Sequence, residues 1–253
     1  MRRVLKILLW GFLIVFVLPL ALSAARHYAS GEAKADWRAA DRSSAGLLQS
    51  PQQHRDAAIR IYAARTVRWR GIFAVHCWLV YKPAGAAAYT RYDYTAWTEL
   101  PVRMNGYAAD GRWFGRVPET VYTLDGAAAE RLIPEIEAAI ARYPLAAAGD
   151  YRAWPGPNSN TFIQAILDAV PALDATLPAL AIGKDFPYDG SWLRPTADRA
   201  GLRLSLRGYG GVTLGWREGV ALDLFGAAVR LDLRRPALEL PGLGRFGVAP
   251  QAG

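Results

Sequence analysis

One serine and one histidine, far apart in the chain, have the residue types and local settings of a nucleophile and a base. Ser159 is the first residue of an expected helix, after the stiff turn at 155–157 and the N-capping residue Asn158. The unpaired N–H groups and positive dipole end of a helix favour an anion, and the N–H groups of Ser159 and Asn160 are candidate oxyanion donors. A serine hydroxyl needs a partnered base, and His76 is the histidine that lies in an expected strand. The pair predicts cleavage or transfer of an acyl or peptide amide group, with His76 carrying the proton.

The same two residues also have a structural interpretation. A histidine on an apolar strand can be satisfied by the backbone, and a serine at a helix start can serve only to cap the helix. A binding or scaffold protein that keeps the cleft as a ligand pocket therefore stays open, and so does a structural module whose β-rich tail docks a partner. Catalysis predicts that the Ser159 hydroxyl lies within hydrogen-bond reach of the His76 ring in an open cleft.

The strand that carries His76 is indicated by the spacing of apolar side chains. A period of two begins at 67 and predicts a strand over 73–81, with a paired strand over 88–98. Cys77 directly follows His76, so a strand points it to the opposite face. We expect Cys77 to be a small buried apolar residue rather than a nucleophile.

Three helices and a β-rich end are expected around these strands. Ser50 and the proline after it start an amphipathic helix that continues to about 66. Asp125 caps a helix over 126–142, in which Pro134 should cause a kink or a break, and the helix that begins at Ser159 ends near 170. Beyond 190, short apolar stretches between glycines predict a meander of about four strands, which either extends the main sheet or forms a separate layer.

The amino terminus has the pattern of a membrane segment. Arg2, Arg3 and Lys6 precede the charge-free run 7–25, whose length as a helix is about 28 Å, close to the hydrocarbon core of a bilayer. The basic flank favours a cytoplasmic amino terminus, so the folded part is expected in the periplasm of a bacterial inner membrane, with membrane lipid as the partner of 7–25. The small residues at 23–25 also resemble a signal cleavage site, and both alternatives export the remainder of the chain.

The amino-acid composition limits the classes of molecule that the protein is expected to bind. The chain has 30 Lys and Arg against 22 Asp and Glu, a net charge of +8, scattered without long runs. This charge suits anionic head groups, whereas export argues against nucleic acid. One cysteine excludes an intrachain disulfide framework, and three histidines without a zinc pattern predict no metal and no cofactor.

Two further polar segments are candidates for the cleft. Lys184 and Asp185 come after a proline-bounded loop and either line the cleft or form a surface turn with a local ion pair. The segment 112–115 (RWFG) is either an aromatic and cationic edge that faces the substrate or a strand edge with packed rings.

The residues around the pair resemble a known architecture. The motifs His76-Cys77-Trp78 and, at 158–162, NSNTF are similar to those of circularly permuted NlpC-type papain-like enzymes and of the lecithin:retinol acyltransferase group. The resemblance implies a papain-like domain with His76 as base and Ser159 at the position where those families carry cysteine. It implies a third polar residue that orients the base, for which Tyr92, Asp93 and Tyr94 are the candidates; Trp78, Asn158 and Asn160 are placed in the cleft.

Most of the exported part also resembles a bacterial family known as a domain of unknown function, through the motifs HCW, RWFG, PGPNSNTF, AIGKDF and PALELPGLGRFG. That resemblance implies no activity. The expected fold is α+β, with an N-terminal transmembrane helix, a papain-like domain with an antiparallel sheet and a β-rich C-terminal extension. The expected division is 1–25 as anchor or signal, 26–66 as tether and amphipathic helix, 67–190 as the papain-like domain, and 191–253 as the extension.

Overall fold

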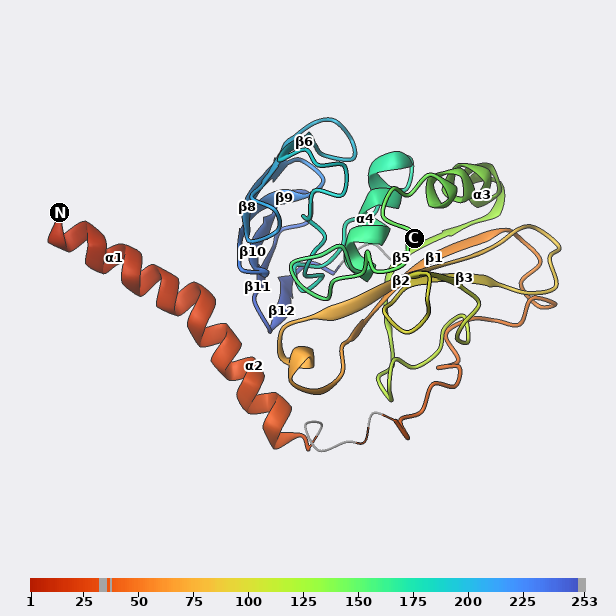
Figure 1. The fold of residues 1–253 in the computed structure, drawn as a ribbon, viewed down its shortest axis with the longest axis horizontal. Helices are drawn as coiled ribbons and strands as arrows, with labels where there is room; N and C mark the ends of the chain where they lie inside the picture. The colour runs from red at the N-terminus through yellow and green to blue at the C-terminus, as the bar shows by residue number, and fades with distance from the viewer. Residues whose placement is uncertain (32–35, 37, 250–253) are drawn as a thin grey trace.

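The protein is described by a computed structural model over residues 1–31, 36 and 38–249 (Figure 1). It is an α+β fold with two antiparallel sheets and an apolar N-terminal helix, which confirms the predicted fold class at this level. The helix runs without interruption from Arg2 to Ala29 as α1 (Arg2–Phe12), a π-helical turn η1 (Leu13–Val17) and α2 (Leu18–Ala29). Among the described residues it is the one helix long and apolar enough to cross a membrane.

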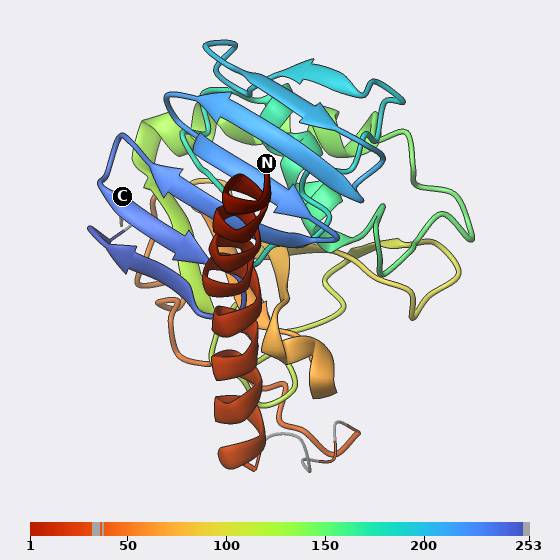
Figure 2. The same cartoon turned by 90° about the vertical axis from the view of Figure 1, so that its left-hand side faces the viewer.

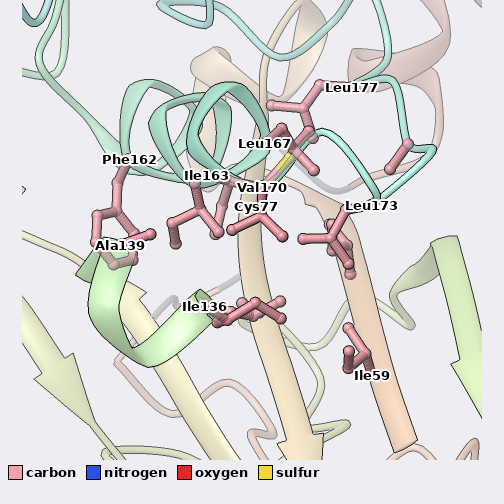
Figure 3. Packing of buried hydrophobic residues seen from close by; sticks show 14 of the residues in the cluster. Ile59, Cys77, Ile136, Ala139, Phe162, Ile163, Leu167, Val170, Leu173 and Leu177 are labelled. Carbon is pink, nitrogen blue, oxygen red and sulfur yellow. The ribbon is translucent and has the colours of Figure 1, made fainter. Parts of the chain in front are cut away.

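The first sheet has five strands in the order β4-β3-β2-β1-β5. Their bounds are β1 Ala58–Arg65, β2 Val75–Lys82, β3 Thr90–Tyr94, β4 Val102–Met104 and β5 Glu119–Asp125. Helices α3 (Gly126–Ala141) and α4 (Ser159–Ala169) pack on one face of this sheet, and every residue of β2 is buried. Figure 3 shows the core between α4 and the sheet, where Cys77 lies among apolar side chains.

The prediction of a helix that starts at Ser50 and continues to about 66 is wrong, because residues 58–65 form the strand β1. β1 lies between β2 and β5, and side chains on both of its faces are buried, one face under the helices and the other in a second cluster. Ile59 and Ile61 face the helices, whereas Tyr62 packs in a second cluster on the other side of the sheet. A strand that is apolar on both faces lacks the alternation that distinguishes it from an amphipathic helix. The folded part therefore begins before the boundary expected at 67.

The kink expected at Pro134 is also absent, since α3 is a single helix with Pro134 inside it. Pro134 lies on the exposed side of α3, between the buried residues Ile133 and Ile136. Proline removes one hydrogen bond to the carbonyl four residues earlier, which water can satisfy on an exposed side. Packing of the buried side of α3 against the sheet keeps the helix continuous.

The second sheet contains seven strands rather than four and forms a separate layer beside α4 (Figures 1 and 2). The strands are β6 Leu193–Pro195, β7 Leu202–Ser205, β8 Gly210–Gly215, β9 Gly219–Leu224, β10 Ala227–Asp232, β11 Ala237–Leu240 and β12 Gly244–Gly247. Its inner face is polar: Arg203 pairs with Asp168 of α4 at 3.2 Å, and the Glu239 carboxylate accepts a hydrogen bond from the Ala179 N–H. Buried ion pairs and charge-assisted hydrogen bonds therefore join this sheet to the first domain.

Candidate active site

The start of α4 is fixed by a capping box at Asn158, the residue that the sequence predicts as the N-cap. The Asn158 side chain accepts hydrogen bonds from the N–H groups of Asn160 (2.9 Å) and Thr161 (3.3 Å), and the Thr161 hydroxyl accepts one from the Asn158 N–H (3.1 Å). Asn158 also donates to the carbonyl oxygens of Ala153 and Ile182. These contacts satisfy three of the four free N–H groups at the helix start, those of Asn158, Asn160 and Thr161, and hold Ser159 at its first position.

This cap excludes one of the two predicted oxyanion donors. The Asn160 N–H is already bound to the Asn158 side chain, so it cannot donate to an oxyanion without losing that hydrogen bond. The Ser159 N–H belongs to the first-turn groups that have no partner within the helix, and it remains a candidate.

Gly183, in the AIGKDF motif, packs directly against the cap. It has a φ of +89°, and a Cβ at this position would lie 2.3 Å from Asn158 Nδ2. Both the backbone conformation and the space therefore require glycine.

Replacing Gly183 with alanine should displace Asn158 and loosen the start of α4. Gly190 is a matched control, because its φ is +82° but a Cβ there meets nothing within 4 Å. The Gly190→Ala change reports the conformational penalty alone, roughly 1 kcal/mol or somewhat more. We expect Gly183→Ala to lower the free energy of unfolding by about 2 kcal/mol beyond that, since it also removes a cap and forces a clash. Equal urea midpoints for the two variants would show that Gly183 does not support the cap.

The Asn160 side chain ties the start of α4 to the strand that carries His76. Its Oδ1 accepts a hydrogen bond from the Cys77 N–H (3.2 Å), and its Nδ2 donates to the carbonyl oxygens of Val75 (3.0 Å) and Ile182 (2.8 Å). Two of these three backbone groups belong to the residues on either side of His76. The amide therefore joins the first turn of α4 to the segment of β2 that carries His76, although Cys77 and Asn160 are 83 positions apart in the sequence.

His76 lies in a buried hydrogen-bond chain on the sheet. Its Nε2 is 2.9 Å from Asp93 Oδ1, and the Arg91 guanidinium donates to both oxygens of Asp93 at 2.7 and 2.8 Å. The imidazole stacks on the Trp113 indole, with ring centroids 3.7 Å apart and 3° between the planes. Asp93 and Trp113 therefore fix the orientation of the ring, and Nδ1 is the nitrogen left to act on a second group.

The surroundings of His76 and Asp93 set the protonation states of these two side chains. Burial lowers the pKa of His76 below its ordinary value of 6.5, although Asp93 partly opposes this effect. Burial alone would raise the pKa of Asp93, but the hydrogen bond from His76 and the charge of Arg91 outweigh it and lower that pKa. At neutral pH the site thus holds a neutral imidazole and an ionised carboxylate, which is the state a general base requires.

His76 and Ser159 line one cavity of about 550 Å³. Asn158 and Asn160 also belong to its wall. The cavity is bordered by large apolar rings: Trp69, Phe73, Trp97, Trp113, Trp154 and Phe225. Its volume is within the range of small-molecule sites.

The Ser159 hydroxyl does not bind the His76 ring directly. Its hydrogen bond goes to Asn160 Oδ1 at 3.5 Å, a length at the limit of such bonds. Within the described part of the chain no hydrogen bond joins Ser159 to His76. Catalytic hydrogen bonds are often long before substrate binds, so a shared cavity with a weakly held hydroxyl is compatible with activation.

Two predicted cleft residues lie outside the cavity. Trp78 is fully buried on the far side of His76, where its Nε1 donates to the Ala109 carbonyl and its ring lies under the Arg91 guanidinium. Tyr92 is on the other face of β3 and stacks on Tyr81, so it cannot orient His76. The alternation of β3 places Arg91 and Asp93 together on the face of His76. That alternation is the signal that favours Asp93 among the three candidates for the third polar residue.

Lys184 and Asp185 are also outside the cavity, and both are buried instead of forming a surface turn. The Lys184 ammonium lies 2.6 Å from Asp185 and 3.2 Å from Asp223 of β9. Burial raises the pKa of Asp223 to about 7. This triad belongs to the polar contact between the first domain and the second sheet. Over residues 1–31, 36 and 38–249, no group of His, Cys, Asp and Glu is arranged to hold a metal ion.

Comparison with known families gives one match. Residues 56–186, just over half of the chain, match the family described as "Protein of unknown function (DUF3750)". The chain belongs to this family. The predicted membership of a family of unknown function is confirmed, whereas the papain-like resemblance stays a prediction. No curated protein and no solved structure matches the chain.

The DUF3750 segment contains the candidate catalytic residues and every residue of the cavity wall except Phe225. It begins just before β1 and ends just after Asp185, so it includes the five-stranded sheet, both packed helices and the residues His76, Asp93 and Ser159. The N-terminal helix and the second sheet lie outside it.

Proposed function

We propose that this protein is an acyl hydrolase or acyltransferase of the bacterial envelope, built on a papain-like frame with serine as the nucleophile. One observation carries the proposal: Asp93 engages Nε2 of His76, while Nδ1 is left to act on Ser159 across the cavity that both residues line. The Asn160 bridge supports it, because it fixes the position of the serine relative to that strand.

The reaction uses a nucleophile, a base and an orienting carboxylate. Ser159 Oγ attacks the carbonyl carbon of the substrate, and His76 Nδ1 takes the hydroxyl proton. Asp93 stabilises the resulting imidazolium, and the Ser159 N–H at the positive end of α4 faces the developing oxyanion. His76 then gives its proton to the leaving alcohol or amine. Water, or an acceptor hydroxyl or amine, attacks the acyl-serine by the same steps and releases the product.

The cavity wall favours an acyl group over a polar peptide. Trp69, Trp97, Trp154 and Phe225 are exposed aromatic residues that border the cavity. Such rings suit an alkyl chain, with the polar reacting carbonyl held at Ser159. We therefore favour a lipid ester or amide among the envelope substrates, with a peptidoglycan peptide as the alternative.

The N-terminal helix supports a location of this activity at the inner membrane. We propose that residues 7–25 span the bilayer once, with the amino terminus in the cytoplasm and the folded part in the periplasm. Its length and apolar composition support a span, and Arg2, Arg3 and Lys6 before the run support this orientation. Protease added to spheroplasts should then degrade the folded part while the bilayer is intact. Protection until detergent is added would contradict this topology, and a soluble periplasmic product without residues 1–25 would favour the cleaved signal.

A serine-reactive fluorophosphonate tests the chemistry directly. The full-length protein in detergent should be labelled covalently at one residue, and Ser159→Ala should lose this label entirely. Ser191→Ala is the matched control, because Ser191 is exposed and its side chain does not line the cavity of His76. Absence of labelling in folded wild-type protein, or persistent labelling of the Ser159→Ala variant, would refute a serine nucleophile.

A non-catalytic binding protein is the second candidate. The observation that favours it is the Ser159 hydroxyl, which contacts Asn160 rather than His76. In that case the cavity would hold an apolar ligand, and Ser159→Ala would bind it as well as the wild type does. A covalent acyl-serine intermediate that forms in the wild type and is lost in Ser159→Ala separates the two candidates.

A further inference from the structure

The second sheet directs its charged residues inward and its apolar residues outward. Strand register joins one outer row across all seven strands: Pro195, Leu202, Leu214, Val220, Leu231, Leu238 and Phe246. The adjacent inner row is Arg194, Arg203, Thr213, Ala221, Arg230, Glu239 and Arg245. This is the reverse of a sheet that has one face in water, where polar residues point outward.

The outer face is uniformly apolar and is as large as the largest apolar patches of soluble monomers. A second row beside the first contains Leu193, Leu204, Val212, Leu222 and Val229. Leu202, Leu214 and Leu231 are 55%, 53% and 47% exposed. Seven strands of three to six residues cover on the order of 500 Å², near the upper limit for the largest apolar patch of a soluble monomer. Something other than water is expected to cover it.

The N-terminal helix lies on this same face. Figures 1 and 2 show it on the side of the sheet opposite α4, where it crosses in front of the strands. The Ser23 hydroxyl donates to the carbonyl of Gly242, between β11 and β12. Further toward the amino terminus, η1 lies in contact with β10, and Phe16 of that turn is buried.

These contacts fix the depth of the sheet relative to the proposed span. The charge-free run ends just before Arg26, and Ser23 and Phe16 lie roughly 5 and 15 Å before Arg26 along the helix axis. The hydrocarbon core is about 30 Å thick, so a helix that spans it carries both residues within the lipid. The parts of the sheet that touch them must then lie at the level of the lipid as well.

We propose that the outer face of β6–β12 is seated in the lipid bilayer, so that the protein has a second membrane contact beside its helix. This rests on the proposed membrane span. Trp192 and Trp216, both 61% exposed, stand in loops at the ends of strands of this sheet, and tryptophan favours the membrane interface. Phe225 belongs to the turn after β9 and also lines the cavity of His76 and Ser159. The membrane-seated sheet and the candidate site therefore share a border, which suits a substrate taken from the lipid.

Lipid-borne quenchers test the contact in the full-length protein. The variants Leu214→Cys and Leu231→Cys carry a bimane label in phosphatidylcholine vesicles, with and without nitroxide-labelled lipid. Glu135→Cys on α3 is the control remote from the sheet, and Leu9→Cys reports the helix. Native Cys77 is fully buried, and burial raises the pKa of its thiol, so it should not react. We expect the nitroxide lipid to reduce fluorescence at Leu214→Cys, Leu231→Cys and Leu9→Cys but not at Glu135→Cys.

The pattern of quenching separates this inference from the membrane span. Quenching at Leu9→Cys without quenching at the two sheet positions would overturn the seated sheet and leave the span intact. Absence of quenching at all positions would overturn both. Unquenched sheet positions that form disulfide-linked dimers under oxidation would identify a second copy of the chain, rather than lipid, as the cover.

Discussion

Replacing Asp93 with asparagine is expected to slow fluorophosphonate labelling of Ser159 by about 10³- to 10⁴-fold, the scale of the corresponding change in serine-protease triads. The Arg91 guanidinium donates to both Asp93 oxygens, so the oxygen of an asparagine would stay with Arg91. Its NH₂ group would then face His76 Nε2 and donate to it. The histidine proton would move to Nδ1, and the nitrogen that should accept the serine proton could no longer do so.

The same substitution removes the charge partner of a buried guanidinium, which costs about 3–5 kcal/mol in other proteins. A loss of labelling must therefore be distinguished from unfolding. Asp110→Asn is a suitable control, because Asp110 is buried and accepts hydrogen bonds from the N–H groups of Leu47 and Leu48 but does not contact His76. At a temperature where circular dichroism shows both variants folded, Asp110→Asn should label at nearly the wild-type rate. Wild-type labelling by a folded Asp93→Asn variant would refute the role of Asp93 as the orienting group.

The start of α4 can be predicted from sequence because its signals are local. Asn158, Ser159 and Thr161 lie within one turn at the cap, and a capping box depends only on residues three apart. The strand of His76 can be predicted for the same reason, since the period of two in its side chains is contained within residues 73–81. The sequence narrows the partner of His76 to three adjacent residues without selecting one. The choice depends on the register of β3 against β2, which decides the residues that share the face of His76 and is not visible in either segment.

The parts that the sequence does not predict depend on contacts distant along the chain. β1 resembles a helix because both of its faces are buried, one by α3 and α4 and the other by the cluster of Tyr62, Trp78 and Trp113. The residues that cover it are distant in the chain and are not visible in the segment itself. Trp113, which stacks on His76, comes from a loop whose path the apolar pattern does not determine. The strands after 190 can be predicted from the alternation of apolar and polar residues. That alternation does not show which face of the sheet packs against the first domain. The inner side is the charged one, because Asp168, Lys184 and Asp185 of the first domain provide its partners.

Asn160 is the residue whose loss should affect stability and site geometry together. Asn160→Ala removes three buried hydrogen bonds, at about 1 kcal/mol each, and leaves the Cys77 N–H and the Val75 carbonyl without this partner, at about 1–3 kcal/mol per unsatisfied group. The higher helix propensity of alanine offsets only about 0.5 kcal/mol. We expect a decrease of roughly 3–5 kcal/mol in the free energy of unfolding, measured by urea denaturation of the detergent-solubilised chain.

Gln164 of the same helix offers the comparison that makes this decrease interpretable. Gln164 is also buried, but the hydrogen bond of its side-chain amide goes to Asp168, one turn further along α4, and not to another strand or loop of the described chain. Gln164→Ala should therefore cost about 1 kcal/mol and leave the distance between Ser159 and His76 unchanged. If the Asn160 bridge is what joins α4 to β2, the Asn160→Ala variant should lose labelling at urea concentrations where Gln164→Ala still reacts. Equal stability and equal labelling of the two variants would mean that apolar packing of Phe162 and Ile163 against the sheet, rather than the amide, positions the serine.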